Sequence, residues 1–557
     1  MIFRNCVLIC LFLAYHLPVF SQKILLNQHW QFKSTTEKKW HDATVPGTVH
    51  TDLLANHIID DPFYRDNETK QQWISKQDWE YKTSFDAEKQ STKAVLQFEG
   101  LDTYAKVYLN DSLILQSDNM FRTYRIEVGQ LLKQQNNLLR IVFESAENKA
   151  AQLAKNSPRK FPCENQRNFV RKAQYHFGWD WAPRMITCGI WRQVSLIYTP
   201  SEKIADAQYS NVQLIQEKDS IGQSFYFNVN GKPTFMKGAN WIPADVFLPR
   251  ITHDKYRSLL IAAKQAGMNM LRVWGGGIYE DDYFYTLCDS LDIYIWQDFM
   301  FAGAMYPTDA YALENIRQEA IDNILRLRKH KCIVLWCGNN EIDEAWHNWG
   351  WQKQFNLSQS DSTALWRGYQ QLFHELLPSL VSQYDSGRAY IASSPLHGWG
   401  RTQSMTHGDS HYWGLWWGLD SISVMKKKIP RFMSEYGMQA MPDISSIRQF
   451  ALENEMDTST SVIQLHQKHP TGFQTLTKYL QMENIPVTDF TSFVMGTQEL
   501  QSRVVETALN AQLQANGRCM GSLIWQLNDC WPVCSWSLID YYGTKKKAYY
   551  TFQKVGK

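Results

Sequence analysis

Two glutamates stand where short apolar runs, of the kind that form buried β-strands, come to an end. Glu341 follows the run Ile333 to Cys337 after three residues, and Glu435 closes the string Arg431-Phe432-Met433-Ser434. A pair of carboxyl groups can cut a glycosidic bond, because one protonates the leaving oxygen while the other attacks the anomeric carbon or activates water. Either glutamate alone would more often be a salt-bridged surface residue. Together, each beside amide, aromatic and glycine residues, they predict glycosidase chemistry.

The composition excludes one large class of partner and favours another. The 557 residues carry 57 Lys+Arg against 55 Asp+Glu, so no basic surface of the kind that binds nucleic acid is expected. Aromatic residues make up 14% of the chain, and many of its 22 Trp stand beside polar residues rather than inside apolar runs. Flat aromatic faces beside carboxylates and amides suit sugar rings.

The first 22 residues are predicted to be a secretory signal peptide, because Arg4 precedes an apolar stretch too short to span a bilayer. We therefore expect a secreted or periplasmic protein, or a lysosomal one if the host is an animal. No later segment resembles a membrane helix, so no membrane association is expected after cleavage. The eight Cys beyond the signal are scattered, which favours free thiols or at most one or two bridges. Cys530 and Cys534 lack a second ligand pair, and we predict no metal and no cofactor.

Two different patterns of predicted secondary structure divide the mature chain. Residues 23–199 show short alternating strands separated by turns, which is the pattern of a jelly-roll β-sandwich. The clearest of these strands are Trp79–Phe85, Lys93–Phe98, Ala105–Asn110 and Asn137–Phe143. Residues 200–224 are polar and poor in strand signals, so we expect a linker there.

From residue 225 to residue 557 strands alternate with helices, which predicts a (β/α)8 barrel of ~250 residues with insertions. We expect helices at Asp254–Ala266, Ala312–Arg328 and Ala364–Tyr384, and a surplus between Met438 and Met520. The eight predicted strands are Phe235–Asn240, Met268–Trp274, Ile293–Phe299, Cys332–Gly338, Ala389–Ser394, Ser404–Gly408, Arg431–Glu435 and Gly521–Leu527. Such barrels do their chemistry at the carboxyl ends of the strands, and Glu341 and Glu435 follow strands four and seven.

Other strand ends supply polar and aromatic residues to the same rim. Arg272 and Trp274 close strand two ahead of three glycines, which let backbone approach a ligand. Asn340 is well placed to bind the sugar hydroxyl beside the reacting carbon, although it could instead cap the following helix. Strand three leads to Asp298, strand six leads to Asp409, His411 and Tyr412, and strand eight supplies Trp525.

These motifs resemble those of a β-mannosidase of glycoside hydrolase family two. Asn340-Glu341 is similar to that family's acid/base signature, and Ser434-Glu435-Tyr436-Gly437 to its nucleophile signature. The string that runs from Arg272 to Gly277 is typical of β-mannosidases, whereas β-galactosidases and β-glucuronidases usually follow the arginine with a Ser-His-Tyr-Pro-like string. N-terminal strings agree: Val45–His50, Asp61–Tyr64 and His176–Arg184.

The resemblance implies a function and a set of site residues. It implies an exo-acting, retaining hydrolase of terminal β-D-mannosides in oligosaccharides or glycans, with Glu435 as nucleophile, Glu341 as acid/base and their carboxyl groups about 5 to 5.5 Å apart. The residues implied to contact the sugar are Trp179, Asp180, Arg272, Trp274, Asn340, Trp349, Tyr412 and Trp525.

The chain departs from the family at two places. Family members carry an immunoglobulin-like sandwich of ~100 residues between jelly roll and barrel, where this chain has only a remnant or a linker at residues 200–224. The C-terminal sandwiches are also expected to be missing. We expect the uncovered apolar surfaces to make the chain prone to association, while a direct contact through Trp179 and Asp180 keeps the two domains together.

Two other kinds of function stay open. One is a different exo-β-glycosidase, such as an exo-β-glucosaminidase or a β-galactosidase, which would differ only in the polarity of the pocket. The other is a catalytically impaired carbohydrate-binding protein, since a sequence cannot show that Glu341 and Glu435 face each other. A panel of aryl β-glycosides separates these alternatives.

Overall fold

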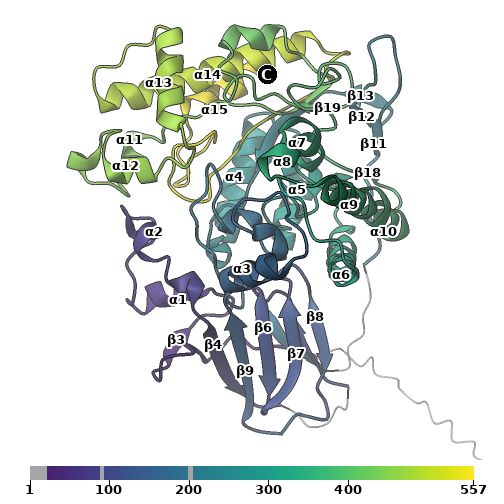
Figure 1. Cartoon of the computed structure of the whole chain (residues 1–557), viewed down its shortest axis with the longest axis vertical. Helices are drawn as coiled ribbons and strands as arrows, with labels where there is room; N and C mark the ends of the chain where they lie inside the picture. The colour runs from purple at the N-terminus through teal and green to yellow at the C-terminus, as the bar shows by residue number, and fades with distance from the viewer. Residues whose placement is uncertain (1–21, 88–92, 199–204, 557) are drawn as a thin grey trace, which may run out of the picture.

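A computed structural model of the chain describes residues 22–87, 93–198 and 205–556. The predicted signal peptide lies outside these residues, apart from Gln22, the first residue of β1. Figure 1 shows two main bodies stacked along the long axis: a β-sandwich at one end and a larger body of mixed strands and helices at the other. No helix among the described residues combines the length and the apolar composition needed to cross a bilayer.

The N-terminal body is the predicted jelly roll. A four-stranded antiparallel sheet, in the order β1-β10-β5-β8, faces a six-stranded sheet in the order β3-β2-β4-β9-β6-β7. Side chains alternate along the strands, as in β9, so that one face of each sheet is buried. Phe32 and Ile141 from one sheet pack with Leu96 and Leu196 from the other in a single core.

The strands of the jelly roll are β1 (Gln22–Leu25), β2 (Trp30–Ser34), β3 (His41–Ala43), β4 (Trp79–Phe85), β5 (Val95–Phe98), β6 (Tyr104–Leu109), β7 (Ser112–Asp118), β8 (Tyr124–Glu127), β9 (Asn137–Glu144) and β10 (Val194–Tyr198). Its helices are α1 (Val49–Ala55), α2 (Asn67–Lys70) and α3 (Ala146–Asn156), with 3-10 turns at Ile74–Lys76, Arg167–Phe169 and Gln174–His176.

The stretch between the two domains is more than the linker we predicted. It contains β11 (Val212–Ile215), which pairs with β12 (Tyr226–Val229) and then β13 (Lys232–Thr234) in an antiparallel sheet. Phe225 and Phe227 are 1% and 0% exposed against the first residues of the barrel strands, including Met236. This small sheet therefore caps the amino-terminal end of the barrel. The strand β11 was not predicted because it has only four residues and lies inside a polar stretch.

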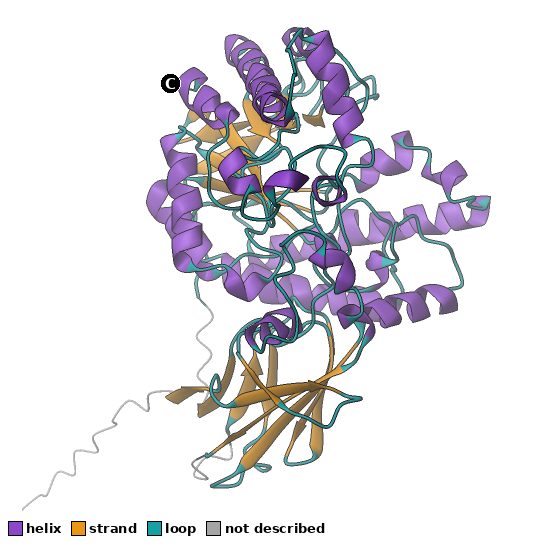
Figure 2. Cartoon of the chain, turned by 90° about the vertical axis from the view of Figure 1, so that its left-hand side faces the viewer, coloured by secondary structure: helices purple, strands orange, loops and turns teal. Residues whose placement is uncertain are grey.

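The C-terminal domain is built on eight parallel strands in the order β18-β17-β16-β15-β14-β21-β20-β19. This is the strand order of the predicted (β/α)8 barrel. These strands are β14 (Met236–Trp241), β15 (Met270–Val273), β16 (Tyr294–Asp298), β17 (Ile333–Cys337), β18 (Ala389–Ile391), β19 (Asp409–His411), β20 (Phe432–Glu435) and β21 (Gly521–Ile524). Figure 2 shows helices surrounding the strands of this domain, with the jelly roll below.

The barrel closes between β18 and β19 through the loop that follows β18. The amide of His397 donates to the carbonyl of Asp409 at 3.3 Å, and that of Trp399 donates to the carbonyl of His411 at 3.0 Å. This loop therefore runs beside β19, and the barrel strands enclose one central space. Its polar lining is the candidate site described below.

Most helices follow the predicted strand and helix alternation. The predicted helix Ala364–Tyr384 is one continuous unit made of α9, a π-helical stretch at Gln371–Leu376 and α10. The surplus after strand seven is helical and contains α14, the longest helix. The helices are α4 (His253–Gln265), α5 (Asp282–Leu291), α6 (Ala310–Leu327), α7 (Ile342–Asn348), α8 (Trp351–Gln354), α9 (Gln359–Gln370), α10 (Leu377–Tyr384), α11 (Ile444–Ile447), α12 (Ser461–Leu465), α13 (Gly472–Met482), α14 (Phe490–Gln514) and α15 (Lys547–Val555), with 3-10 turns at Leu248–Arg250, Ile422–Lys426 and Glu453–Glu455.

One strand prediction was wrong. Ser404–Gly408 forms turns and a bend, and strand six is β19, which begins at Asp409. Its three residues are all polar and all buried. Hydrophobic periodicity cannot find such a strand, because it contains no apolar residue, and the side chains of Asp409 and His411 are held by hydrogen bonds inside the barrel.

The jelly roll and the barrel share an extensive contact, as predicted. The loop that carries Trp179 and Asp180 is fixed by Trp531, whose indole donates to the carbonyl of Trp181 at 3.0 Å. Arg171 of the jelly roll forms a buried ion pair with Glu319 of α6, with a nitrogen to oxygen distance of 2.6 Å. Apolar side chains from both domains belong to one continuous core, so the Asp180 loop is placed rigidly over the barrel.

Candidate active site

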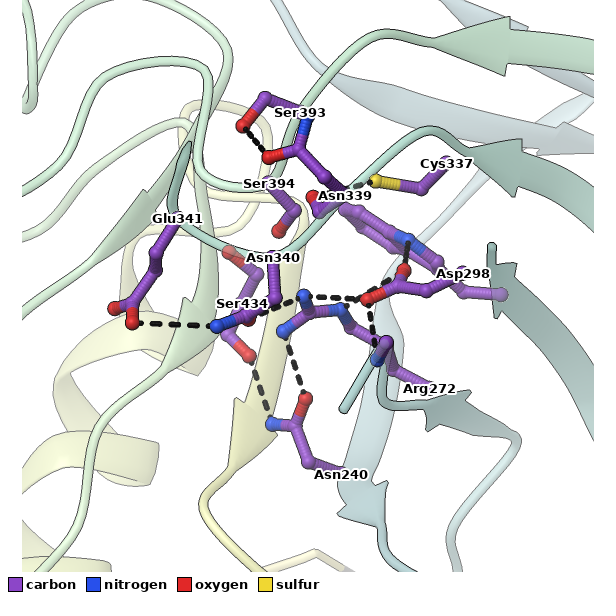
Figure 3. A network of polar contacts seen from close by, with 12 residues as sticks. Asn240, Arg272, Asp298, Cys337, Asn339, Asn340, Glu341, Ser393, Ser394 and Ser434 are labelled. Atoms are coloured by element: carbon purple, nitrogen blue, oxygen red, sulfur yellow. Dashed lines mark hydrogen bonds and ion pairs between the residues drawn. The ribbon is translucent and has the colours of Figure 1, made fainter. Parts of the chain in front are cut away.

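Arg272, at the carboxyl end of β15, is the centre of a buried polar network (Figure 3). Its guanidinium is fully buried and contacts two carboxylates, Asp298 at 2.8 Å and Glu435 at 2.6 Å. The remaining donors reach the amide oxygens of Asn240 at 3.1 Å and Asn340 at 2.8 Å. Ion pairs and amide acceptors together compensate the cost of burying this charge.

Glu435 is the last residue of β20, and its carboxylate points into this network. It is 3% exposed, and one of its oxygens accepts a hydrogen bond from Arg272. Burial raises the pKa of Glu435 to about 7, with the negative charge of Glu341 adding to the rise, while His411 and Arg272 oppose it. Because Arg272 touches Glu435 directly, the ionised form of this carboxyl is the better compensated of the pair.

Glu341 occupies a strained backbone position between β17 and α7. Its φ of 63° and ψ of 5° lie in the left-handed region, which costs a residue other than glycine about 1 kcal/mol or more. The amide of Glu341 donates to the carbonyl of Ser394 at 2.8 Å and holds this conformation. Burial raises the pKa of Glu341 to about 7, against the opposing effects of Arg272 and of the hydrogen bond from Asn340.

The structure separates the roles of the two asparagines before Glu341. Asn339 is the residue that caps α7, because its side-chain oxygen accepts from the amide of Ile342 at 3.0 Å. Asn340 accepts from Arg272 and donates to Glu341 at 3.2 Å, as Figure 3 shows. Asn340 is therefore part of the polar site, and the alternative that it merely caps a helix does not hold.

His411, at the end of β19, bridges the two glutamates. Its Nδ1 lies 2.9 Å from an oxygen of Glu341 and 3.3 Å from an oxygen of Glu435. One ligand atom from each of these three residues lies within 4.8 Å of the other two. Burial lowers the pKa of His411 to about 4, so the ring is neutral near pH 7. The two carboxyl groups thus face each other across one small buried space.

Asp180 brings a third acid to the same space from the jelly roll. Burial raises its pKa to about 7, and the charges of Glu341 and Glu435 add to the rise. Among the described residues its carboxyl has a backbone hydrogen bond with its own residue and no side-chain partner, so it can still bind a ligand. Three buried acids cannot all be ionised together, so the pocket holds protons near neutral pH.

Tryptophans form a wall between jelly roll and barrel. Trp274 of the barrel meets the ring of Trp179 at 4.9 Å and that of Trp525 at 5.6 Å, edge to face. A Cβ on Gly276 would lie 1.9 Å from the Trp274 ring, so only glycine fits there. Such a wall offers an apolar face to a sugar ring beside the buried acids.

Two predicted residues take other positions. Trp349 ends α7, is 47% exposed, and contacts the ring of Trp351. The phenol of Tyr412 is turned to the carboxylate of Asp420, and only its backbone amide bonds to Glu435. Neither side chain has a contact, among those found for the described residues, with the network of Arg272. Their roles toward substrate stay predictions.

Sequence reasoning placed Asp298, Asp409 and His411 at strand ends on the same rim but gave them no role. It did not single out Asn240 and Ser394, which carry no local signal of function. In the structure all five are 1% exposed or less and support the acids.

The comparisons with known proteins agree with this geometry. Residues 30–192 match the family described as glycosyl hydrolase 2 galactose-binding domain-like. The chain is 32% identical to β-mannosidase B of Aspergillus fumigatus, over 96% of this chain and 77% of that protein. A crystal structure of β-D-mannosidase from Dictyoglomus thermophilum is 34% identical, with a TM-score of 0.89 over 96% of this chain and 78% of that one.

This chain belongs to the β-mannosidase family of glycoside hydrolases. It is an exo-acting β-glycosidase of glycosyl hydrolase family 2, and Glu341, Glu435 and Arg272 stand at its centre. An exo-chitosanase from Amycolatopsis orientalis shares only the fold, at 14% identity and a TM-score of 0.71. The alignment with the Aspergillus fumigatus relative runs over 655 positions and takes in 96% of the 557 residues of this chain, so about 120 of its positions have no counterpart here.

Glu341, His411 and Glu435 have the number and kind of ligand atoms that a metal site needs. The charge around them fits a metal poorly in this glycosidase. Arg272 is already bound to Glu435 at 2.6 Å and is fully buried. A divalent cation beside that guanidinium would add like charge inside a space of low dielectric constant. The guanidinium of Arg272 therefore already supplies the positive charge that a metal ion would bring to this site.

Proposed function

We propose that this chain hydrolyses terminal, non-reducing β-D-mannosides with net retention of configuration. The observation that carries the proposal is the spacing of the acids, since one oxygen of Glu341 lies within 4.8 Å of one oxygen of Glu435. Inverting enzymes keep their carboxyl groups about 6.5 to 9.5 Å apart to admit a water, whereas retaining enzymes place them about 5 to 5.5 Å apart. The shorter spacing favours direct attack by a carboxylate.

The surroundings of the two acids assign their roles. Glu435 is the nucleophile, because its contact with Arg272 supports the carboxylate form. Glu341 is the acid/base, because its contacts are the Asn340 amide and the neutral ring of His411. With the pKa of both groups raised to about 7 by burial, the pair binds one proton near neutral pH, and that proton belongs on Glu341.

The reaction then runs in two displacements. The Glu435 carboxylate attacks the anomeric carbon while Glu341 gives its proton to the departing oxygen, which leaves a covalent mannosyl-enzyme. Glu341, now ionised, takes a proton from a water that attacks the same carbon from the opposite face. Asn340 is placed to bind the hydroxyl beside that carbon, where the contact strengthens in the transition state.

Release of single sugars is supported by the way the jelly roll covers the barrel mouth. The loop with Trp179 and Asp180 lies beside Trp274 and the acids, so the space is a short pocket rather than an open groove. Mannose as the sugar is supported by the two β-mannosidase relatives and by the string from Arg272 to Gly277. Secretion rests on residues 1–22 alone and stays a prediction.

A panel of p-nitrophenyl β-glycosides tests the substrate. We expect release of p-nitrophenol from the β-mannoside, and little from the β-galactoside, β-glucoside and β-glucosaminide. Proton NMR during the first minutes of turnover should show β-mannose before mutarotation. Faster cleavage of another glycoside would show that the substrate carries a different sugar. If α-mannose appeared first, the mechanism would be inverting. No cleavage of any glycoside in the panel would favour a carbohydrate-binding protein.

Asp180→Ala should impair catalysis far more than folding. A hydrogen bond from a charged group to the sugar that tightens in the transition state is worth about 2 kcal/mol, or about 30-fold in kcat/KM. Asp42→Ala is the matched control, because it makes the same substitution at an exposed position of β3 in the same domain. A fall in the melting temperature of Asp180→Ala large enough to account for its lost activity would instead assign Asp180 a structural role.

Chelators should leave the activity unchanged. Because Arg272 already supplies the positive charge beside Glu435, we expect dialysis against EDTA to change kcat by less than about twofold, a change of under 0.5 kcal/mol in the barrier. Loss of activity on dialysis, with recovery on adding one divalent metal, would show that Glu341, His411 and Glu435 hold an ion.

A further inference from the structure

His411 is a titratable group between the two catalytic acids to which the mechanism above assigns no task. We propose that Asp409, acting through Ser394, fixes His411 as the tautomer with its hydrogen on Nε2, so that Nδ1 accepts a hydrogen bond from Glu341 and keeps the catalytic proton there. The proposal rests on Glu341 being the acid/base of the proposed function. It makes Asp409, Ser394 and His411 positioning residues for the proton.

The orientation of the Ser394 hydroxyl follows from Asp409. The Oδ2 of Asp409 lies 2.7 Å from the Oγ of Ser394 and 2.6 Å from the Oγ of Ser434. Its Oδ1 accepts from the amide of Leu396 at 2.8 Å. A carboxylate can only accept, so each serine hydrogen must point to Asp409. The hydrogen of Ser394 is thereby committed, and its oxygen presents only lone pairs to other neighbours.

The hydrogen on the imidazole follows from Ser394. Nε2 of His411 lies 3.1 Å from the Oγ of Ser394, and two facing lone pairs at that distance would repel each other. Arg272 cannot supply the hydrogen, because the two protons of its Nη1 go to Glu435 at 2.6 Å and to Asn240 at 3.1 Å, while Nε2 is 3.4 Å away. Nε2 therefore carries a hydrogen and donates it to Ser394.

Nδ1 is then a bare acceptor facing the acids. Burial keeps the ring neutral by lowering the pKa of His411 to about 4, which is consistent with a single ring hydrogen. The nearest oxygen to Nδ1 belongs to Glu341 at 2.9 Å. Such a contact is attractive only when Glu341 carries a proton to donate, because a carboxylate would meet the ring's lone pair.

The charged and titratable groups around His411 are Glu341, Glu435, Arg272 and Asp409. The Glu435 oxygen that Arg272 does not bind lies 3.3 Å from Nδ1, farther than the 2.9 Å of the Glu341 oxygen. Arg272 faces Glu435 and favours its ionised form, while Asp409 faces the opposite end of the ring through Ser394. When a glycosidic oxygen enters the pocket, it competes with Nδ1 for the proton of Glu341. This tautomer of His411 thus keeps the proton on Glu341 until substrate binds.

Asp409→Asn tests the relay, because the structure predicts which way the new amide must turn. The Leu396 amide requires an acceptor at the position of Oδ1, so the amide NH2 would face Ser394 and donate to it. The Ser394 hydrogen would then turn to Nε2, and the ring hydrogen would move to Nδ1. A donor at Nδ1 favours ionised Glu341, so the basic limb of kcat should shift down by about one pH unit.

The loss should depend on the leaving group. At pH 7 to 8 we expect Asp409→Asn to lose about tenfold on a mannosyl disaccharide and much less on 2,4-dinitrophenyl β-mannoside, which needs no protonation. Ser434→Ala is the matched control, since it removes the other serine bonded to the same oxygen of Asp409 without touching His411. Its basic limb should stay in place. An unshifted limb in Asp409→Asn with retained melting temperature would overturn the proposal.

A direct measurement is independent of turnover. ¹⁵N NMR of protein labelled at histidine, with His411 assigned by its loss in His411→Gln, should show a protonated Nε2 and a bare Nδ1 in the parent, and the reverse in Asp409→Asn. A hydrogen on Nδ1 of the parent would refute the tautomer. Because this readout needs no substrate, it can fail while the proposed β-mannosidase activity stands, and it can succeed if the true substrate is another β-glycoside.

Discussion

Glu435→Ala is expected to lower turnover of p-nitrophenyl β-mannoside on the order of 10⁵-fold, as removal of a covalent nucleophile does in other hydrolases. No neighbouring group can replace it, because Arg272 and His411 occupy the space beside its carboxylate. The variant should fold, since alanine leaves the buried Arg272 still paired with Asp298. Its melting temperature and its affinity for a mannose-configured inhibitor are the checks on folding.

Azide should rescue this variant and reveal the geometry. A small anion can enter the space vacated by the carboxylate and attack the anomeric carbon from the side of β20, opposite the leaving group. The product should be α-mannosyl azide, of inverted configuration relative to the substrate. Glu506→Ala, on the exposed face of α14, serves as the control and should behave as the parent. Rapid hydrolysis by Glu435→Ala without azide would assign the nucleophile elsewhere.

Glu341→Ala should show a different signature, because only a poor leaving group needs a proton. We expect a loss of about 10² to 10⁴ in kcat/KM on a mannosyl disaccharide, the usual contribution of general acid catalysis. With 2,4-dinitrophenyl β-mannoside the first displacement should remain fast, and the mannosyl-enzyme should accumulate as a burst of released phenol. Azide should then give β-mannosyl azide, since it replaces water on the second face.

The pH profile separates this variant further. Because the proposal keeps the proton on Glu341 while Glu435 ionises, removing Glu341 should leave the acid limb of kcat/KM, which reports Glu435, nearly in place. The basic limb, which reports the proton on Glu341, should disappear. Parent-like activity of Glu341→Ala on the disaccharide would show that another group protonates the leaving oxygen.

The sequence alone was enough to single out the two glutamates that we propose as catalytic acids. Local patterns identified the jelly roll, seven of the eight barrel strands and most helices, because buried strands and amphipathic helices repeat their apolar residues at fixed periods. The glutamates could be found because the barrel topology carries the carboxyl ends of all its strands to one rim. Position along a strand therefore predicts position in space for Glu341 and Glu435.

Only the tertiary structure decided which neighbouring groups shift the pKa values of those two acids. The contacts of Arg272 with Asp298 and Glu435, and the chain from Asp409 through Ser394 to His411, join residues far apart in sequence and have no period. β19 was misplaced because its three residues are all polar, and β11 was missed because it is a four-residue strand inside a polar stretch. Apolar packing repeats along the chain and can be read locally, whereas the burial of a charge depends on partners that only the folded chain brings within reach.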